Sequence, residues 1–299
     1  MKKLKIALDW TANTNHTGFY AAQQLGFYEQ AGIDLVIETP DQDNYALTPA
    51  KKVELGSADF ALCPFESIIS YRTKNTPFDA VALAAIFQED ISAIATLKSK
   101  AVESPKDLDG LVYASYKARY EDEIVKQMVR NDGGTGAIKL VYPEKLGIWE
   151  TILTGKADAT WIFENWEGVR AKNEGVALNL FRMRDYDVPY GYSPVIMAGK
   201  QQTLGQTKLI GAFLEVTKRG YLYAKDNPSE AVAFIRPFIS DQDKNIDLNE
   251  SQELSSRYYG DSNTWGLMEE KHVQRFLTWL QDNGLEKGAL RYTELVLRL

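Results

Sequence analysis

The sequence predicts an α/β protein made of two α/β lobes with a ligand cleft between them. Strand-like and helix-like runs alternate along most of the 299 residues, which is typical of α/β proteins with parallel sheets. The alternation forms two successive series that are separated by chain crossings near residues 88–92 and 190–195. A mostly helical tail follows the second series. We therefore expect residues 1–90 and 193–299 to form one lobe and residues 91–192 to form the other.

The first series begins with a strand at KIAL, residues 5–8, which is followed by a helix-like run at 16–32 and a second strand at 34–40. The apolar positions change from a period of two to a period of 3.6, and glycines punctuate the ends, so this stretch predicts a β-α-β unit with a parallel sheet. Residues 51–64 repeat the pattern as a short helix, a glycine turn and a strand. FDAVALAAIF, residues 78–87, is a continuous apolar run typical of a strand covered on both faces.

The second series resembles the first and begins near residue 92. It runs through SAIATLKS and SPKDLDGLVYASY to the helical stretch EDEIVKQMVRNDGG, which is followed by a strand in IKLVYP. LGIWETILTGK predicts an amphipathic helix with Trp149 in the core, and ADATWIF predicts the next strand. The turn-formers of RDYDVPYGYSP end this series before the strand VIMAG. The tail predicts helices in three stretches, TKLIGAFLEVTKRGYLYAKDN, PSEAVAFIRPF and EEKHVQRFLTWLQDNG.

Composition excludes several function classes. The net charge of -7, with 44% apolar and 25% charged residues, is that of an ordinary globular protein and leaves no basic face for nucleic acid. A single cysteine, Cys63, cannot form an intramolecular disulfide or a cysteine-based metal site. The sequence contains no glycine-rich phosphate loop, H-E-x-x-H motif or G-x-S-x-G elbow. We expect no cofactor and no metal.

The N-terminal sequence and the apolar runs bear on location. No apolar stretch approaches the roughly 18 to 20 residues that span a bilayer, so we expect no membrane insertion. Met1-Lys2-Lys3 leads straight into a strand without an apolar signal segment. We expect a cytoplasmic protein if Met1 is the native start, and a periplasmic or otherwise extracytoplasmic one if an export signal has been removed.

Candidate ligand contacts follow from the rule that ligands bind beyond the carboxyl ends of parallel strands. Asp9 and its neighbours follow the first strand, and further polar and aromatic residues follow later strands and the second crossing. Aromatic rings, amides and a few carboxylates suit a flat heteroaromatic ligand that is held by stacking and by hydrogen bonds to the ring edge. The expected ligand contacts are Trp10, Asn13, Asn15, His16, Glu66, Glu89, Tyr116, Tyr120, Trp161, Glu164, Tyr190 and Tyr192.

Several of these residues have a structural alternative. Asn13 and Asn15 can cap the following helix, because short polar side chains do so routinely. Glu164 can cap or form a salt bridge within its own lobe, and in a pair with Glu167 it could instead serve acid–base catalysis. An unpaired cysteine beside a strand, such as Cys63, is more often a small buried apolar residue than a nucleophile.

The motifs LDWTANTNHTGFYAAQQLGFYEQAGIDL, VELGSADFAL, VESPKDLDG and ADATWIFENWEG occur in the same order as in a known superfamily. The chain resembles thiamin-pyrimidine-precursor binding proteins and fungal pyrimidine synthases over nearly its whole length. This resemblance implies a type II periplasmic-binding-protein fold, the solute-binding role of an ABC transporter with a permease partner, and an aminopyrimidine ligand of the formylaminopyrimidine or hydroxymethylpyrimidine type.

The departures from the superfamily separate its branches. The fungal enzymes hold pyridoxal phosphate on a lysine after the ADFAL-like strand, with a histidine a few residues on and a cysteine-rich run in the second domain. Here that loop reads LCPFESIISY and contains neither lysine nor histidine, and no cysteine follows Cys63. The resemblance therefore favours a binding protein. A pyrimidine-forming enzyme, a hydrolase using Glu164 with His16, and a cytosolic ligand sensor are the alternatives.

Overall fold

The computed structural model describes residues 1–299, which divide into two compact units. The first unit contains Met1–Asp90, Gly191–Val273 and Ala289–Leu299, and the second contains Ile91–Tyr190 and Gln274–Gly288. We expected residues 274–288 with the first series, but they group with the second unit. The hinged closure of two lobes around a ligand stays a prediction.

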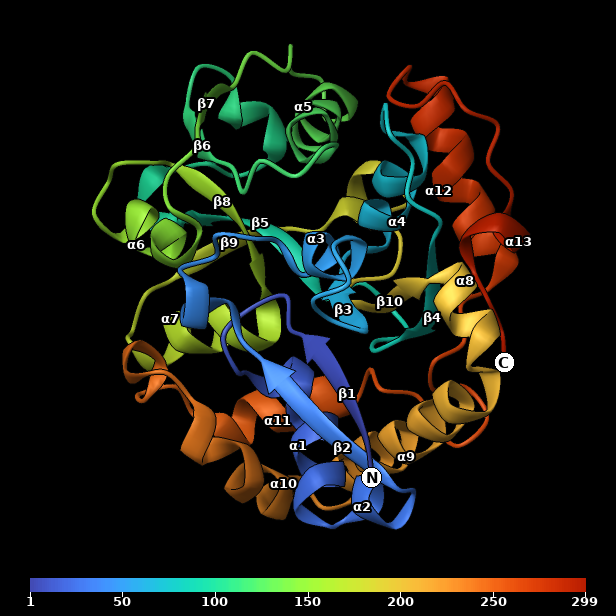
Figure 1. The fold of residues 1–299 in the computed structure, drawn as a ribbon. Helices are drawn as coiled ribbons and strands as arrows, with labels where there is room; N and C mark the ends of the chain where they lie inside the picture. The colour runs from blue at the N-terminus through green and yellow to red at the C-terminus, as the bar shows by residue number, and fades with distance from the viewer. The chain divides into compact units, whose positions relative to one another are not determined.

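The first unit contains a five-stranded mixed sheet in the order β2-β1-β3-β10-β4. β1 pairs with β2 in parallel from Lys2 to Ala7, which confirms the expected first β-α-β unit. β3 is parallel to β1, whereas β10 runs antiparallel to both β3 and β4, so the sheet is mixed. The strands are β1 Lys2–Ala7, β2 Ile33–Glu38, β3 Phe60–Cys63, β4 Ala80–Ala85 and β10 Val195–Gly199 (Figure 1).

The helices of the first unit are short in the N-terminal part and longer in the tail. The helix-like run at 16–32 is split in two, because Gly26 adopts a left-handed φ of 70° between the segments. Gly26 and Gly32 are the two glycines expected to punctuate this stretch, and both have a positive φ. The helices are α1 Thr17–Gln24, α2 Phe27–Gln30, α3 Pro49–Glu54, α4 Phe65–Thr73, α8 Lys200–Gly205, α9 Thr207–Asp226, α10 Pro228–Ile235, α11 Leu248–Ser256, the start of α12 Glu270–Asp282, and α13 Tyr292–Leu295.

The second unit also contains a five-stranded mixed sheet, in the order β7-β6-β8-β5-β9. β6 is parallel to β7 and β8, and β5 is antiparallel to β8 and β9. Trp149 is buried in the core of this unit with Ile148 and Ile152, as expected. The elements are β5 Ser92–Leu97, β6 Val112–Ala114, α5 Glu121–Asn131, β7 Lys139–Val141, α6 Ile148–Leu153, β8 Ala159–Phe163, α7 Val169–Asn173, β9 Leu178–Phe181 and the remainder of α12.

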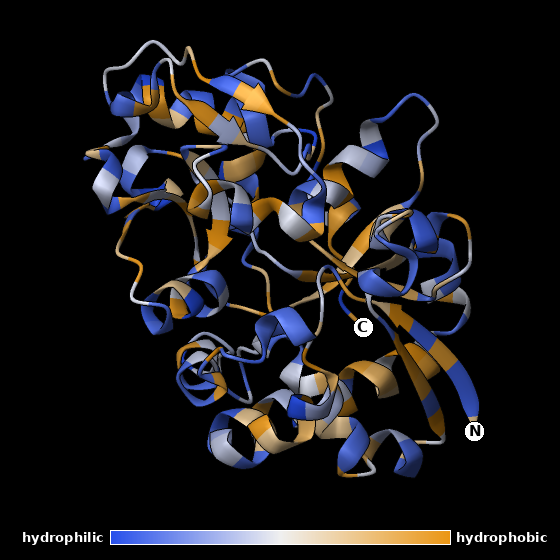
Figure 2. Cartoon of the chain, turned by 90° about the vertical axis from the view of Figure 1, so that its left-hand side faces the viewer, coloured by the Kyte–Doolittle hydropathy of each residue, from blue (hydrophilic) through white to orange (hydrophobic).

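Burial follows from the residue pattern of each element. Every residue of β4 is buried, which confirms the strand covered on both faces that its continuous apolar run predicted. The strands are coloured mainly as apolar in Figure 2, whereas most helices carry both colours. A helix with both kinds of residue can bury one side and leave the other in water.

Two glycines allow α1 and α9 to pack closely. A Cβ at Gly18 would lie 2.2 Å from the ring of Tyr221, and a Cβ at Gly220 would lie 2.0 Å from the carbonyl oxygen of Gly18. A backbone carbonyl cannot move aside as the end of a flexible side chain can. Any residue larger than glycine at position 220 would therefore clash with α1. The close approach also places the buried Tyr221 beside the segment that follows β1, where its hydroxyl donates to the Asn15 carbonyl at 2.7 Å.

We expect Gly220→Ala to lower the free energy of unfolding by about 1–3 kcal/mol, since the added methyl group overpacks the α1–α9 contact. Gly211→Ala, on the same helix, is the matched control, because a Cβ there would meet nothing within 4 Å. The control should be neutral or stabilising by up to about 1 kcal/mol through helix propensity. Urea denaturation of both variants measures the difference, and equal stabilities would contradict the close-packing account.

Candidate functional site

Three parallel strands of the first unit end at the same edge of its sheet. β1 pairs in parallel with both β2 and β3, so their carboxyl ends lie side by side. The segment from Asp9 to His16 follows β1, and the first turn of α4 with Glu66 follows β3. The sheet thus brings two of the predicted loops to the edge at which α/β proteins bind ligands.

His16 closes the loop after β1 with both of its ring nitrogens. The Asn13 N–H donates to His16 Nδ1 at 3.2 Å, and His16 Nε2 lies 2.8 Å from Asp9 Oδ1. Because Nδ1 accepts a hydrogen bond, the neutral tautomer carries its proton on Nε2, which donates to Asp9. The His16 side chain is fully buried. Its two nitrogens therefore hold the loop and orient a carboxylate.

The short 3₁₀ turn Thr14–His16 is held by buried polar contacts from its own loop and from the C-terminal helices. Asn13 Oδ1 accepts from the Asn15 N–H at 2.8 Å, so the capping alternative for Asn13 is confirmed. The Thr14 hydroxyl lies 2.7 Å from that of Ser251, and the Tyr259 hydroxyl donates to the Thr14 carbonyl at 2.6 Å. Asn13 and Asn15 are both 2% exposed, and their contacts with ligand stay predictions.

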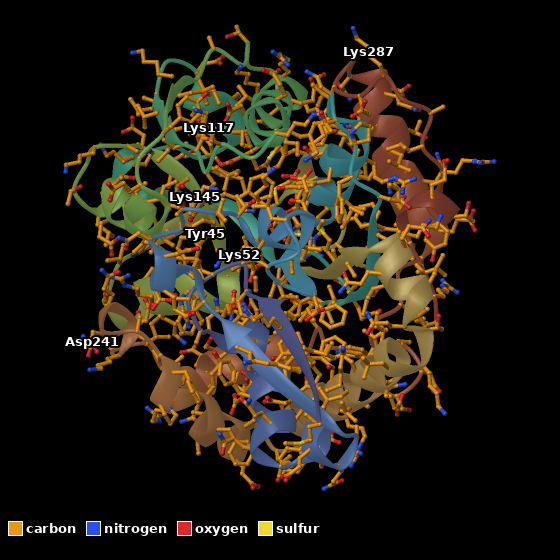
Figure 3. The ribbon with its side chains drawn as sticks, in the orientation of Figure 1. Tyr45, Lys52, Lys117, Lys145, Asp241 and Lys287 are labelled. Carbon is orange, nitrogen blue, oxygen red and sulfur yellow. The ribbon has the colours of Figure 1, made fainter.

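Trp10 and Tyr45 form an aromatic pair beside Asp9. Their ring centroids lie 6.1 Å apart at an interplanar angle of 55°, and both residues are half-buried. The Tyr45 hydroxyl donates to the Asp9 carbonyl oxygen, and burial raises the pKa of Tyr45, so this phenol stays protonated. Tyr45, labelled in Figure 3, comes from the stretch before α3. Sequence reasoning missed it, because that stretch carried no strand or helix pattern to place it at the sheet edge.

The remaining predicted residues of the first unit lie in different environments. Glu66 is 5% exposed at the start of α4, and Glu89 is exposed. Tyr192 is 5% exposed, and its hydroxyl accepts from the Glu269 N–H at 2.9 Å. Cys63 is buried, and desolvation raises the pKa of its thiol. A protonated buried thiol is a poor nucleophile, which favours the apolar role for Cys63.

The second unit also gathers polar and aromatic residues after its parallel strands β6, β7 and β8. Glu121 accepts hydrogen bonds from the Tyr113 hydroxyl and from the backbone N–H groups of Tyr116 and Ala118, at 2.9–3.2 Å. Burial raises the pKa of the Glu121 carboxyl. These bonds shape the β6–α5 loop and leave Tyr116 half-buried. The Tyr120 side chain is instead buried, and its hydroxyl donates to Glu286 at 2.7 Å.

Trp161 and Tyr190 form the aromatic pair of the second unit. Their ring centroids lie 4.9 Å apart at 59°, and Tyr190 also packs edge-on against Phe276 with 5.6 Å between centroids. Trp161 is half-buried, whereas Tyr190 is 7% exposed. Trp161 lies on β8, and Tyr190 is the last residue of the segment Ile91–Tyr190. The two rings are far apart in the sequence and come into contact only because the second unit folds.

Glu164 forms a two-pronged ion pair with Arg182 inside the second unit. Arg182 Nε donates to Glu164 Oε1, and Arg182 Nη2 donates to Oε2 at 2.6 Å. Glu164 begins a π-helical turn, Glu164–Gly168, in which the Glu167 carboxylate accepts from the Phe163 N–H at 3.0 Å. The salt-bridge alternative for Glu164 is thus observed. Both Glu164 oxygens are engaged by a guanidinium 18 residues away in the chain, and no local pattern could have shown this.

Residues 1–299 contain no group of three or more His, Cys, Asp or Glu side chains placed to hold a metal ion. None of the helices is long and apolar enough to cross a membrane.

Sequence comparison finds a family match and related proteins. The profile of the family described as "NMT1/THI5 like" matches residues 13–231. The formylaminopyrimidine-binding protein of Halalkalibacterium halodurans is 26% identical over 78% of this chain and 69% of its own length. The 4-amino-5-hydroxymethyl-2-methylpyrimidine phosphate synthase of Legionella pneumophila is 23% identical over 77% of this chain and 71% of its own length.

Comparison with solved structures confirms the fold. The alkanesulfonate-binding protein of Xanthomonas axonopodis pv. citri superposes with a TM-score of 0.73 at 11% identity, covering 99% of this chain and 98% of its own. The periplasmic aliphatic sulphonate binding protein of Escherichia coli gives a TM-score of 0.69 at 11% identity, covering 99% and 92%. The chain therefore has the periplasmic-binding-protein fold that the resemblance implied.

We expect Glu167→Ala to lower the free energy of unfolding more than Glu164→Ala. Glu167 is 8% exposed, and its removal leaves the Phe163 N–H without its acceptor, at a cost of about 1–3 kcal/mol. The Glu164–Arg182 pair is more exposed, and such pairs contribute about 0.2–1 kcal/mol. Chemical unfolding followed by circular dichroism measures both variants. The reverse order would show that the ion pair contributes more to the stability of this unit than the Glu167 contact does.

Proposed function

Because the chain belongs to the NMT1/THI5-like family, we propose that it is a solute-binding protein for a small heteroaromatic ligand. The aromatic pair of Trp10 and Tyr45 beside Asp9, at the carboxyl ends of parallel strands, is the observation that carries this proposal. A flat ring stacks on such side chains, and a neighbouring carboxylate accepts hydrogen bonds from ring substituents. More specifically, we propose a thiamin pyrimidine precursor of the formylaminopyrimidine or hydroxymethylpyrimidine type as the ligand. The name of the Halalkalibacterium relative supports this choice.

The proposed role is uptake of this ligand through an ABC-type permease. The fold supports it, because the matched solved structures include the ligand-binding component of an ABC-type import system and a periplasmic sulphonate-binding protein. An extracytoplasmic location is part of the same proposal. This partnership is tested by co-purifying the chain with a permease from its native membrane, with and without the pyrimidine. Co-purification that depends on the pyrimidine supports the partnership. A chain that binds no permease under either condition refutes it.

A pyrimidine synthase is the second candidate, favoured by the name of the Legionella relative. The chemistry of the first unit supports binding without turnover, since Cys63 is a buried thiol with a raised pKa and both His16 ring nitrogens are engaged in the loop. Incubation with candidate substrates, followed by mass spectrometry of the small molecules, distinguishes the two. Unchanged pyrimidine supports the binding role, and a new product supports the enzyme.

We expect Trp10→Ala to weaken the binding of 4-amino-5-hydroxymethyl-2-methylpyrimidine at least about tenfold, because a stacking contact and the area that it buries are lost. Trp279→Ala is the matched control, since Trp279 is also half-buried but lies on α12 and stacks on Phe276. Calorimetric titration and thermal melting of both variants supply the comparison. Equal affinities of the two variants would remove Trp10 from the site.

Trp161→Ala tests the second unit separately. If Trp161 contacts the ligand, the same titration shows a loss comparable to that of Trp10→Ala, because both residues are half-buried tryptophans paired with a tyrosine. Unchanged affinity together with a lowered melting temperature would restrict the role of Trp161 to packing against Tyr190.

A further inference from the structure

We propose that Asp9 selects the ligand by accepting a hydrogen bond from an exocyclic amino group, and thereby rejects rings that carry an oxo group at the same position. This inference rests on the proposed function and adds a specificity residue to it. Glu164 is the second-unit carboxylate among the ligand contacts expected from the sequence, and Asp9 follows the first strand. The contacts of the two carboxylates in their own units favour Asp9 for this task.

The two Asp9 oxygens are used differently. Oδ1 accepts from His16 Nε2 at 2.8 Å, whereas Oδ2 takes part in no hydrogen bond. The Asp9 side chain is 15% exposed, so solvent or a ligand reaches part of it. Glu164 differs, because Arg182 engages both of its oxygens and neutralises its charge. Asp9 therefore keeps one acceptor available, and Glu164 keeps none that is not already bound to a cation.

The surroundings of Asp9 hold its carboxylate in one orientation. His16 is fully buried and is itself fixed by the Asn13 N–H, so its Nε2–H approaches Asp9 from a set direction. The Tyr45 hydroxyl holds the Asp9 carbonyl oxygen, which fixes the backbone at the same residue. His16 is thus a positioning residue. A fixed acceptor discriminates between ligands more sharply than a mobile one, because it cannot turn away from an unsuitable group.

The chemistry of an available carboxylate oxygen determines which ligands it accepts. An amino group on a pyrimidine presents an N–H, which a carboxylate accepts in a charge-assisted hydrogen bond. An oxo group at the same position presents a lone pair to the negative charge, and such a mismatch is an effective means of rejection. Trp10 and Tyr45 are indifferent to this change, because stacking reads the face of the ring and not its edge.

Asp9→Asn gives a sharp test because His16 dictates the orientation of the introduced amide. The Nε2–H of His16 requires an acceptor, so the amide would turn its carbonyl oxygen toward His16 and place its NH₂ group where Asp9 has Oδ2. The substitution thus exchanges an acceptor for a donor with almost no change in size. Asp41→Asn is the matched control, since Asp41 is an exposed aspartate of the same unit.

The experiment titrates 4-amino-5-hydroxymethyl-2-methylpyrimidine and its 4-oxo analogue into the unmodified protein and both variants by calorimetry, with a thermal melt of each. We expect the unmodified protein and Asp41→Asn to prefer the amino ligand at least about tenfold. Asp9→Asn should weaken amino-ligand binding by about ten- to a hundredfold and bind the oxo analogue as well or better, as expected when a polar contact is lost or reversed.

The possible outcomes separate this inference from the function on which it rests. A preference for the amino ligand that survives Asp9→Asn would overturn the role of Asp9 and leave the proposed function intact. An unmodified protein that binds both ligands equally would do the same, even if Asp9→Asn fails to fold. If the unmodified protein binds neither pyrimidine, both the proposed ligand class and the role of Asp9 are refuted.

Discussion

The hydrogen bonds of the buried His16 are the interactions on which the first-unit site depends. One ring nitrogen accepts from the backbone at Asn13, and the other donates to the Asp9 carboxylate, so a single side chain fixes both ends of the loop that carries Trp10. A histidine suits this task because its neutral ring has one donor and one acceptor at fixed positions. Without it, Asp9 would lose the partner that orients it.

The loop is held in turn by elements distant in sequence. Hydroxyl groups of Ser251, Tyr259 and Tyr221 meet the turn at Thr14 and Asn15. Tyr221 comes close because Gly18 and Gly220 allow α1 and α9 to touch through their backbones. The C-terminal helices thus belong to the construction of a site whose motif lies near the N-terminus. These hydrogen bonds matter for stability, because a buried polar group that loses its partner costs free energy.

The two units use their carboxylates in contrasting ways. Glu121 and Glu167 serve backbone N–H groups, and Glu164 is paired with Arg182, so these carboxylates of the second unit are committed to its own structure. In the first unit, Asp9 has one oxygen on His16 and the other without a hydrogen bond. Among these four carboxylates, Asp9 is therefore the one that keeps an oxygen available for a further hydrogen bond.

The sequence by itself determined the α/β class, the first parallel β-α-β unit, the buried β4 and the family resemblance, because periodicity and motif order are local properties of the chain. It also identified the loop after β1 as a concentration of recognition chemistry. Tertiary structure decided that the sheets are mixed. In the first unit, β10 pairs antiparallel with β4, although more than a hundred residues separate the two strands in the sequence. Tertiary structure likewise decided that Tyr45 joins Trp10, that Arg182 neutralises Glu164, and that His16 holds Asp9. Each of these depends on side chains that the fold brings together, and residue type and spacing alone do not show which of several carboxylates keeps an available oxygen.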